Sequence, residues 1–358
     1  MAAIVHVGIV GAGLAGLAAA LATARAGVRV DVFEAQPRLP SLASHLEVVP
    51  NLLRDLVRLG VAEACVRRGF PYQGFAVLDG DGRTHFELPT PRLAGAQWPA
   101  ALGMVYGELL SVLAAAAEAQ GVRLHFDGAA TASPEGPAIV SAGGHRHRFD
   151  LVLVADGRTA PGMQVDLMPQ RWCHVLLPRA PGLERASWVV GASGLKVMLV
   201  PVDTRRAGAA VLLQDDASAE PAAVRAALEA QGSLLRRMAV HWGETGAAIV
   251  RPVRSGLLAQ PWHDDGVLRI GASAHVLPPH FGQSAAQSVE DAVVLGELLG
   301  QGLPRSELLE AFAERRSERA HCVHAVTTQA ARWDLRPDAG TDLRALVERL
   351  APLVARSP

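Results

Sequence analysis

The sequence is poor in several residue types, and each shortage narrows the range of functions. Aromatic residues make up only 4% of the 358 residues, and the formal net charge is −1 with no run of basic residues. Because nucleic acid and anionic membranes attract strongly basic surfaces, neither is a predicted partner. Cys65, Cys173 and Cys322 form no C-x-x-C motif and no evident disulfide framework. That cysteine usage is typical of a cytoplasmic protein.

The N-terminal stretch is apolar but lacks the features of a targeting segment. No basic region precedes the apolar residues between Met1 and Thr23, and glycines interrupt them. A signal peptide begins with basic residues, and a membrane span needs about 20 apolar residues in a row. We therefore expect no integral membrane segment. Half of the residues are hydrophobic, which is enough for one large or two smaller domains.

The first 34 residues contain the most informative pattern. An apolar run from Ile4 to Val10 enters a glycine-rich turn, and an alanine-rich segment with helical character follows. A second apolar run from Val28 to Phe33 then ends at Glu34. The pattern predicts a strand, a turn, a helix and a second strand, with the turn formed by Gly11, Ala12, Gly13, Leu14, Ala15 and Gly16.

This unit is typical of adenine dinucleotide binding. Gly11 permits a tight turn, Gly13 leaves room for a diphosphate, and Gly16 lets the helix pack closely. The helix N-terminus offers free N–H groups and a positive dipole to the phosphates. Glu34, eighteen residues after Gly16, can accept hydrogen bonds from ribose hydroxyls. The alternative is a close-packed turn that has lost its ligand.

The rest of the chain predicts an α/β protein with a second, mostly antiparallel sheet. Continuous apolar runs at 150–155 and 266–271 indicate buried parallel strands. Residues 70–100 predict a hairpin with loops, and residues 172–214 alternate strand-like runs with turns. Helical spacing of apolar residues appears at 51–59, 107–120, 222–237, 285–299, 305–333 and 341–355.

Other candidate sites have ordinary explanations. His321 and His324 have a spacing that could bind a metal on a helix, but no third ligand is evident, so no metal is predicted. Trp98, Trp188 or Trp242 could line a substrate pocket, although core filling is the favoured role.

Two later segments, read in order with the opening motif, resemble a known family. Residues 154–159, VADGRT, resemble the "DG" segment of the group A flavoprotein monooxygenases. Residues 270–275, IGASAH, with 278–283, PPHFGQ, and the later Glu290-Asp291-Ala292 resemble the "GD" segment of that family and its following helix. Over nearly its whole length the chain is similar to the para-hydroxybenzoate hydroxylase and salicylate hydroxylase family.

The resemblance implies a fold and a division of the chain. It implies an α/β fold with a Rossmann-like FAD domain, a second substrate domain built on a mixed, mainly antiparallel sheet, and C-terminal helices. The FAD domain is expected at residues 1–69, 101–165 and 260–358, and the substrate domain at 70–100 and 166–259. The chain is expected to act as a monomer or a homodimer.

The resemblance also implies a chemistry and a set of contacts. NADH or NADPH reduces FAD, O2 adds to give a flavin hydroperoxide, and a small aromatic or heteroaromatic substrate is hydroxylated. His45 and His280 are expected near the flavin ring as candidate catalytic residues. The expected FAD contacts are Gly11, Ala12, Gly13, Leu14, Ala15, Gly16, Glu34, Arg38, Tyr106, Asp156, Ser273, Gly282, Ser284, Ala285 and Ala286.

Several of these positions depart from the family. Ser273 stands where the family has an aspartate, so Ser273→Asp is expected to tighten FAD binding because charge-assisted hydrogen bonds are stronger. Tyr106 replaces an arginine, and Ser284 and His45 replace glycines. Ala160 and Met163 replace a serine and an arginine of the "DG" segment. These changes leave open a second function, a flavin-weak or flavin-free homologue that binds a small molecule or a partner protein.

Overall fold

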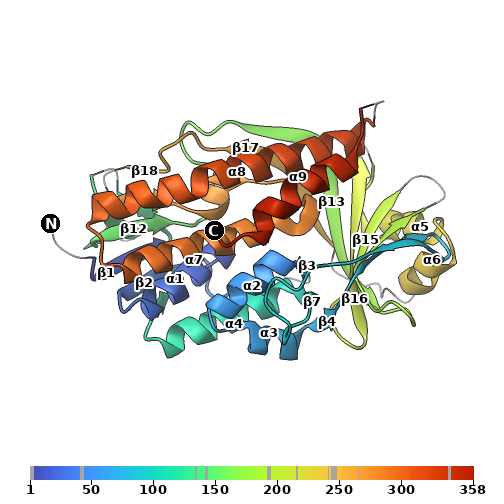
Figure 1. Cartoon of the computed structure of the whole chain (residues 1–358), viewed down its shortest axis with the longest axis horizontal. Helices are drawn as coiled ribbons and strands as arrows, with labels where there is room; N and C mark the ends of the chain where they lie inside the picture. Colours follow the sequence, from blue (N-terminus) through green and yellow to red (C-terminus); the bar gives the residue numbers. More distant parts are fainter. Residues whose placement is uncertain are drawn as a thin grey trace.

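The computed structural model covers the chain with several gaps. It describes residues 4–40, 44–133, 135–141, 144–191, 195–214, 217–240, 242, 248–264, 266–337 and 340–358. The start of the apolar N-terminal stretch, residues 1–3, lies outside the described residues. Figure 1 shows an elongated molecule with one sheet region at each end and long helices along one side.

A six-stranded sheet forms the end that carries the glycine-rich turn. Five neighbouring strands of this sheet are parallel, which confirms the parallel strands predicted from the buried apolar runs. The strand β18 pairs antiparallel at one edge. The apolar residues of β1 pack against α1 (Leu14–Arg25), whose alanines let it lie close to the sheet. The strand order is β18 (His263–Asp264), β19 (Val267–Arg269), β12 (Leu151–Val154), β1 (His6–Val10), β2 (Arg29–Phe33) and β8 (Arg123–His125).

An eight-stranded sheet forms the other end of the molecule and is mixed, mainly antiparallel, as expected. Among the strands of this sheet that the structure describes, only β14 and β5 pair in parallel. The order is β20 (His275–Val276), β17 (Ile249–Leu257), β13 (Val165–Pro178), β16 (Arg206–Gln214), β15 (Lys196–Pro201), β14 (Ser187–Val190), β5 (Phe75–Asp79) and β6 (Thr84–Leu88).

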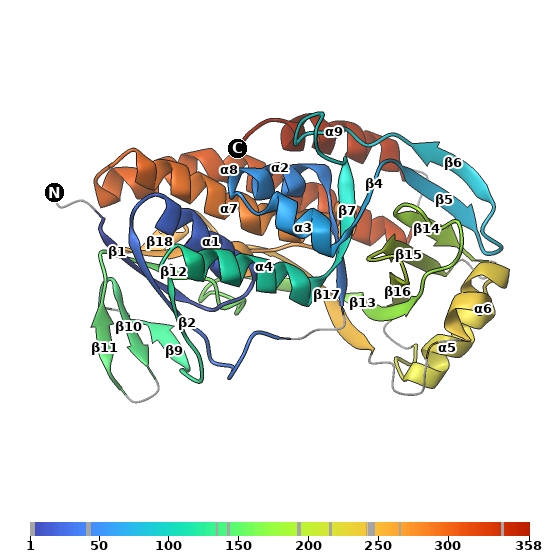
Figure 2. The same cartoon turned by 90° about the horizontal axis from the view of Figure 1, so that it is seen from below.

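Two small sheets complete the β-structure. The first, β3 (His45–Val48), β7 (Ala101–Val105) and β4 (Phe70–Tyr72), lies between the two large sheets (Figure 1). The second, β11 (Arg146–Arg148), β10 (Ala138–Ser141) and β9 (Ala130–Ala132), lies beside β1 and β2 (Figure 2). Sequence patterns did not predict this small sheet of β9, β10 and β11.

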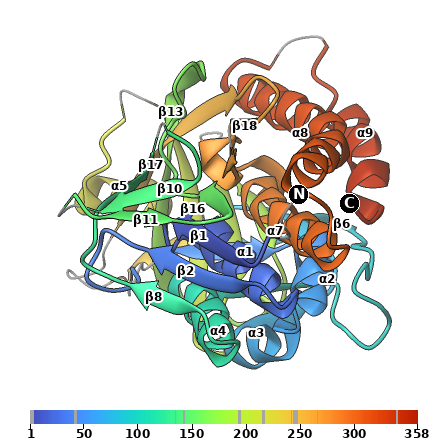
Figure 3. The same ribbon diagram turned by 90° about the vertical axis from the view of Figure 1, so that its left-hand side faces the viewer.

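The helices cover the sheets from several sides. Figure 3 shows α7 (Gln283–Gly300) beside α1, with α8 (Arg305–Leu335) and α9 (Leu343–Ala355) outside them. The helices α2 (Pro50–Arg58), α3 (Ala62–Arg68) and α4 (Tyr106–Ala119) lie near the small sheet of β3. Among the described residues, no helix is both long enough and apolar enough to cross a membrane.

One predicted helix is wrong in detail. The helix expected at 222–237 is two helices, α5 (Pro221–Glu229) and α6 (Ser233–Ala239). Gly232 separates them with φ +145°, and a Cβ there would lie 2.2 Å from the carbonyl oxygen of Gly80. The close approach of a distant loop therefore breaks the helix, which local spacing could not reveal.

A buried network of charges fixes α7 against its neighbours. Asp291 accepts hydrogen bonds from Arg316 Nε at 2.7 Å, the Gly271 N–H at 2.8 Å and His275 Nε2 at 2.8 Å. Burial alone would raise the pKa of Asp291, but His275 and Arg316 lower it to about 2. Glu290, which lies on α7 like Asp291, also forms an ion pair with Arg316 of α8. The network thus ties the short helix η1 (Gly271–Ser273) to α7 and α8.

Candidate active site

The glycine-rich turn follows β1 and has the geometry that its sequence predicts. Gly11 adopts φ +101°, and a Cβ there would lie 2.6 Å from the Ala155 carbonyl oxygen. A Cβ at Gly16 would lie 1.9 Å from the Gly11 carbonyl oxygen. A Cβ at Gly13 would meet no described atom within 4 Å. Packing therefore requires the first and third glycines, whereas the second one borders open space.

The N-terminus of α1 lies directly after this turn and has no side-chain cap. Its first N–H groups lack partners within the helix, as at any helix start. The Leu14 backbone makes a hydrogen bond to the Tyr106 hydroxyl. Burial raises the pKa of Tyr106 although that bond opposes the shift, so the hydroxyl stays protonated. Tyr106 thus reaches the turn where a diphosphate is expected.

Glu34 lies at the end of β2 and faces the same turn. Its Oε2 atom accepts a hydrogen bond from the Ala12 N–H at 2.8 Å, and its Oε1 atom accepts one from Gln36 at 2.9 Å. The N–H of Ala12 is therefore already engaged. A carboxylate has about four acceptor sites, so Glu34 retains capacity for ribose hydroxyls.

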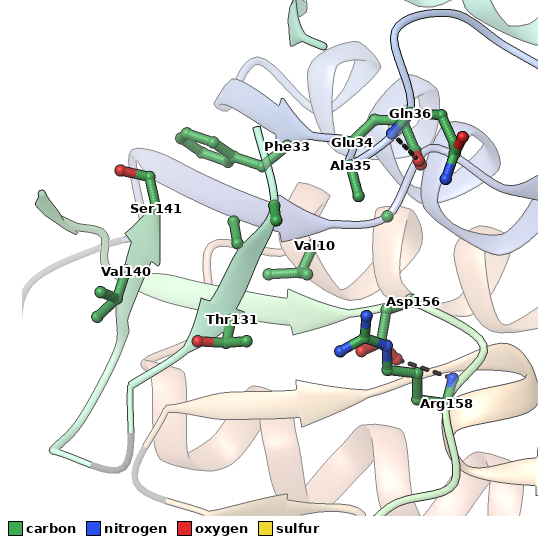
Figure 4. A pocket seen from close by; sticks show the side chains of 13 residues that line it. Val10, Phe33, Glu34, Ala35, Gln36, Thr131, Val140, Ser141, Asp156 and Arg158 are labelled. Atoms are coloured by element: carbon green, nitrogen blue, oxygen red, sulfur yellow. Dashed lines mark hydrogen bonds between the residues drawn. The ribbon is translucent and has the colours of Figure 1, made fainter. Parts of the chain in front are cut away.

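A pocket of about 440 Å³ opens beside Glu34 (Figure 4). Glu34 and Asp156 approach it from different strand ends, and the small β9–β11 sheet forms a wall. Arg38, an expected contact, is exposed and does not line this pocket. The lining residues are Val10, Gly11, Phe33, Glu34, Ala35, Gln36, Ala129, Ala130, Thr131, Val140, Ser141, Asp156 and Arg158.

Asp156 and Ser273 form a joined pair. The Ser273 hydroxyl donates to Asp156 Oδ1 at 2.9 Å and accepts from the Gly157 N–H at 3.2 Å. Asp156 Oδ1 also accepts from the Arg158 N–H at 3.0 Å. Ser273 is only 1% exposed. The hydroxyl at position 273 thus orients the carboxylate at 156, which supplies the negative charge of this part of the site.

A strained turn leads into α7. Phe281 and Gly282 adopt φ +59° and +64°, and a Cβ at Gly282 would lie 2.6 Å from Val49 Cγ1. Non-glycine residues rarely adopt positive φ, and such strain concentrates at functional sites. Helix α7 begins without a side-chain cap. Ser284 is exposed, Ala285 half-buried and Ala286 buried, so the backbone N–H groups of this turn are the candidate donors.

His45 and His280 belong to one cluster of rings with Trp172 and His174, which we call the imidazole–indole cluster. The ring centroids of His45 and His174 are 5.2 Å apart, those of Trp172 and His174 are 6.5 Å apart, and those of Trp172 and His280 are 6.2 Å apart. Gly208 makes room for it, because a Cβ there would lie 1.9 Å from His45 Cγ. The two histidines predicted from the sequence therefore belong to one group of packed rings.

The cluster contains neutral imidazoles. Burial and the neighbouring His174 lower the pKa of His45 well below its usual range. Burial, with a contribution from the charge of Arg251, lowers the pKa of His174 to about 4. Both rings are thus uncharged near neutral pH, and each offers one donor and one acceptor nitrogen.

A short chain of contacts connects the glycine-rich turn with the cluster. Tyr106, which bonds to Leu14, donates its own N–H to the carbonyl oxygen of Ser44 at 2.9 Å. Ser44 immediately precedes His45. The two parts of the site are therefore neighbours, as they must be if one dinucleotide spans both.

Several functional candidates were missed or left open by the sequence. Trp172 and His174 lie two residues apart on β13 and so share one face of the sheet, where Trp172 packs against Ala331 of α8, a placement that depends on sheet register. Trp188 packs beside Trp172 with centroids 5.8 Å apart, whereas Trp242 lies in the core under α5 and α6. His324 makes a hydrogen bond with Ser255 at 2.9 Å. The departures Ala160 and Met163 are both buried.

Comparisons with known proteins decide the family. The FAD binding domain family matches residues 4–150 and 172–327, which together span most of the chain. The chain belongs to the FAD-dependent monooxygenase family. The family identified by resemblance is therefore confirmed.

Relatives of this monooxygenase match it over nearly its whole length. It is 26% identical to the putative FAD-dependent monooxygenase YetM of Bacillus subtilis over 94% of this chain and 96% of that protein. It is 27% identical to 3-amino-4-hydroxybenzoate 2-monooxygenase PtmB3 of Streptomyces platensis over 89% of this chain and 86% of the relative. These likenesses favour an enzyme over a flavin-free homologue.

Solved structures show the same fold. The tetrameric form of 2-methyl-3-hydroxypyridine-5-carboxylic acid oxygenase superposes with a TM-score of 0.82 at 18% identity, covering 97% of this chain and 96% of that one. Klebsiella pneumoniae HpxO complexed with FAD and uric acid gives a TM-score of 0.79 at 19% identity, covering 99% and 93%. The monooxygenase thus has the predicted two-sheet fold.

The residues present in this monooxygenase fit FAD. The open space at Gly13 allows a diphosphate to approach the uncapped start of α1. Glu34 borders a pocket large enough for a nucleoside, and the Asp156–Ser273 pair lies at its other side. The substituted positions Tyr106 and Ser273 are joined to the site by hydrogen bonds and leave the pocket beside Glu34 open.

Proposed function

We propose that this FAD-dependent monooxygenase hydroxylates a small aromatic or heteroaromatic substrate held in the imidazole–indole cluster. The carrying observation is the position of this cluster next to the nucleotide site, through Tyr106 and Ser44. Flat rings and neutral imidazoles suit a flat aromatic compound with polar substituents. The relatives named 3-amino-4-hydroxybenzoate 2-monooxygenase and kynurenine 3-monooxygenase support this substrate class.

The positions of the site residues support the following proposed roles. Gly11, Gly13, Leu14, Ala15 and Gly16 present the start of α1 to the diphosphate. Glu34 binds the ribose, with Ala12 holding its carboxylate in place. The exposed Arg38 follows Glu34 by four residues in the sequence.

At the other side of the pocket beside Glu34, Asp156, oriented by Ser273, accepts hydrogen bonds from the ribityl hydroxyls. Gly282 closes the turn by donating its N–H to the Pro279 carbonyl oxygen at 3.2 Å, and Ser284, Ala285 and Ala286 then place backbone N–H groups near the flavin ring. The buried cluster around His45 excludes water. FAD supplies electrons taken from NADH or NADPH and activates O2 for transfer of one oxygen atom to the substrate.

Two further expectations remain proposals. The free cysteines, two buried and one half-buried, support a cytoplasmic location. The chain is proposed to act as a monomer or homodimer, although one structural relative has a tetrameric form.

A spectrum of the purified protein tests the function. We expect bound flavin, identified as FAD by mass after denaturation, and oxidation of NADH or NADPH that substituted phenols or anilines stimulate. Protein that stays colourless when incubated with FAD would contradict the proposal and support the flavin-free homologue. Flavin binding without stimulated oxidation across a broad aromatic panel would contradict the substrate class alone.

A further inference from the structure

Four buried ring nitrogens in the imidazole–indole cluster have no hydrogen-bond partner among the described residues. They are His45 Nδ1, Trp172 Nε1, His174 Nδ1 and His280 Nδ1. His45 and His280 are each 7% exposed, and Trp172 is 5% exposed. An unsatisfied buried polar group costs about 1–3 kcal/mol. Four in one cluster therefore indicate a place that a polar ligand occupies.

His280 differs from the other three because an acid orients it. Its Nε2 atom lies 2.9 Å from Asp334 Oδ2, and Lys196 pairs with the other oxygen of Asp334. Burial alone would raise the pKa of Asp334, but its bonds to His280 and Lys196 lower it. An ionised carboxylate only accepts hydrogen bonds, so Nε2 of His280 carries the hydrogen. In the neutral ring, Nδ1 then has a free lone pair.

The groups around His280 come from several elements. Asp334 on α8 holds the Nε2 side of the ring and leaves Nδ1 as the nitrogen without a described partner. Lys196 on β15 holds Asp334, while His174 on β13 and His45 on β3 stay neutral. Arg251 on β17 acts electrostatically on His174. A negative oxygen in the cluster would thus meet donors and positive charge.

We infer that His280 is the residue that takes the proton from a hydroxyl group on the aromatic substrate, with Asp334 and Lys196 as its positioning residues. The O–H bond breaks and its electron pair stays on the oxygen, while a new N–H bond forms at Nδ1. The oxygen anion makes the ring richer in electrons, which suits it to accept an oxygen atom. This inference rests on the proposed function and narrows the substrate class to hydroxylated aromatic or heteroaromatic compounds.

Ionisation of a coloured phenol tests the inference without turnover. The FAD-loaded enzyme is mixed with 4-nitrophenol or 4-nitrocatechol in buffer below the solution pKa of each probe, with no reductant. We expect the bound probe to show the phenolate band. In His280→Gln the bound probe should stay neutral. Retained flavin and an unchanged melting temperature would show that this variant folds.

Two more variants complete the design. Asp334→Asn keeps the side-chain shape but removes the charge, so the ratio of ionised to neutral bound probe should fall about tenfold, one pKa unit. This variant carries the test if His280→Gln does not fold. His85→Gln, on the exposed strand β6, should behave like the unmodified enzyme.

The outcomes separate this inference from the proposed function. Three results would overturn the role of His280. The first is binding of the probe to the unmodified enzyme in its neutral form, and the second is no binding at all. The third is ionisation of the probe in His280→Gln and Asp334→Asn as much as in the unmodified enzyme. None of these results depends on oxygen chemistry. Loss of flavin from the unmodified protein would instead overturn the proposed function.

Discussion

The nucleotide end and the ring end of the site are built in opposite ways. At the nucleotide end, Glu34, Asp156 and Ser273 all have hydrogen-bond partners and are held by backbone groups of nearby turns. At the ring end, four ring nitrogens of the imidazole–indole cluster are buried without described partners. The first end is therefore preorganised by its own backbone, whereas the second is completed by a ligand.

The largest expected effect comes from the third glycine of the turn. A Cβ in Gly16→Ala would meet the Gly11 carbonyl oxygen at 1.9 Å, so FAD binding should be lost. Stability should fall by about 3 kcal/mol, the upper end of overpacking costs. Gly13→Ala is the matched control, because its Cβ meets open space. It should keep its melting temperature but lose FAD. Equal melting temperatures for Gly16→Ala and Gly13→Ala would contradict the different roles of the two glycines.

The next effect tests the Asp156–Ser273 pair. The sequence predicts that Ser273→Asp tightens FAD binding, whereas the contact between Ser273 and Asp156 leads us to predict weaker binding. A carboxylate at 273 would lie against Asp156, which is 2.9 Å from the present hydroxyl, and like charges in a buried site repel. FAD affinity should fall by more than about tenfold, or 1.4 kcal/mol. Ser273→Asn controls for size without charge. Tighter binding by the aspartate variant in a flavin titration would restore the original expectation.

A pH effect on β3, the strand that carries His45, should be of moderate size. Burial raises the pKa of Glu47 to about 7, although Tyr72 donates to it at 3.0 Å. The folded state therefore favours the protonated acid, and its stability falls as pH rises from about 4.5 to 7. Glu47→Gln should be roughly 2 kcal/mol more stable than the original above pH 7, with the difference vanishing in acid. The exposed Glu118→Gln should show no such pH dependence in denaturant unfolding.

The smallest effect concerns Tyr106, where the two ends meet. Its hydroxyl bonds to the Leu14 backbone, so it competes with the diphosphate for that N–H. Tyr106→Phe should bind FAD about threefold more tightly, because one hydrogen bond is worth about 0.5–1.5 kcal/mol. The flavin-free form should melt at a lower temperature. Weaker FAD binding by this variant would show that the hydroxyl supports the cofactor instead.

The amino-acid sequence by itself determined the backbone geometry of the nucleotide end. Gly11, Gly13, Gly16 and Glu34 lie within one strand–turn–helix–strand unit, where short-range sterics and hydrogen bonds decide the geometry. The same local reasoning identified the parallel strands and most helices. It failed at Gly232, because a loop far away in the sequence broke the helix.

The tertiary structure decided the ring end. His45, Trp172, His280 and Asp334 come from four separate segments, and no spacing in the sequence relates them. Sheet register placed Trp172 on the face toward α8, and the packing of α8 brought Asp334 to His280. Side-chain sites of this kind depend on long-range packing, which local patterns do not encode, whereas a backbone motif carries its geometry within its own residues.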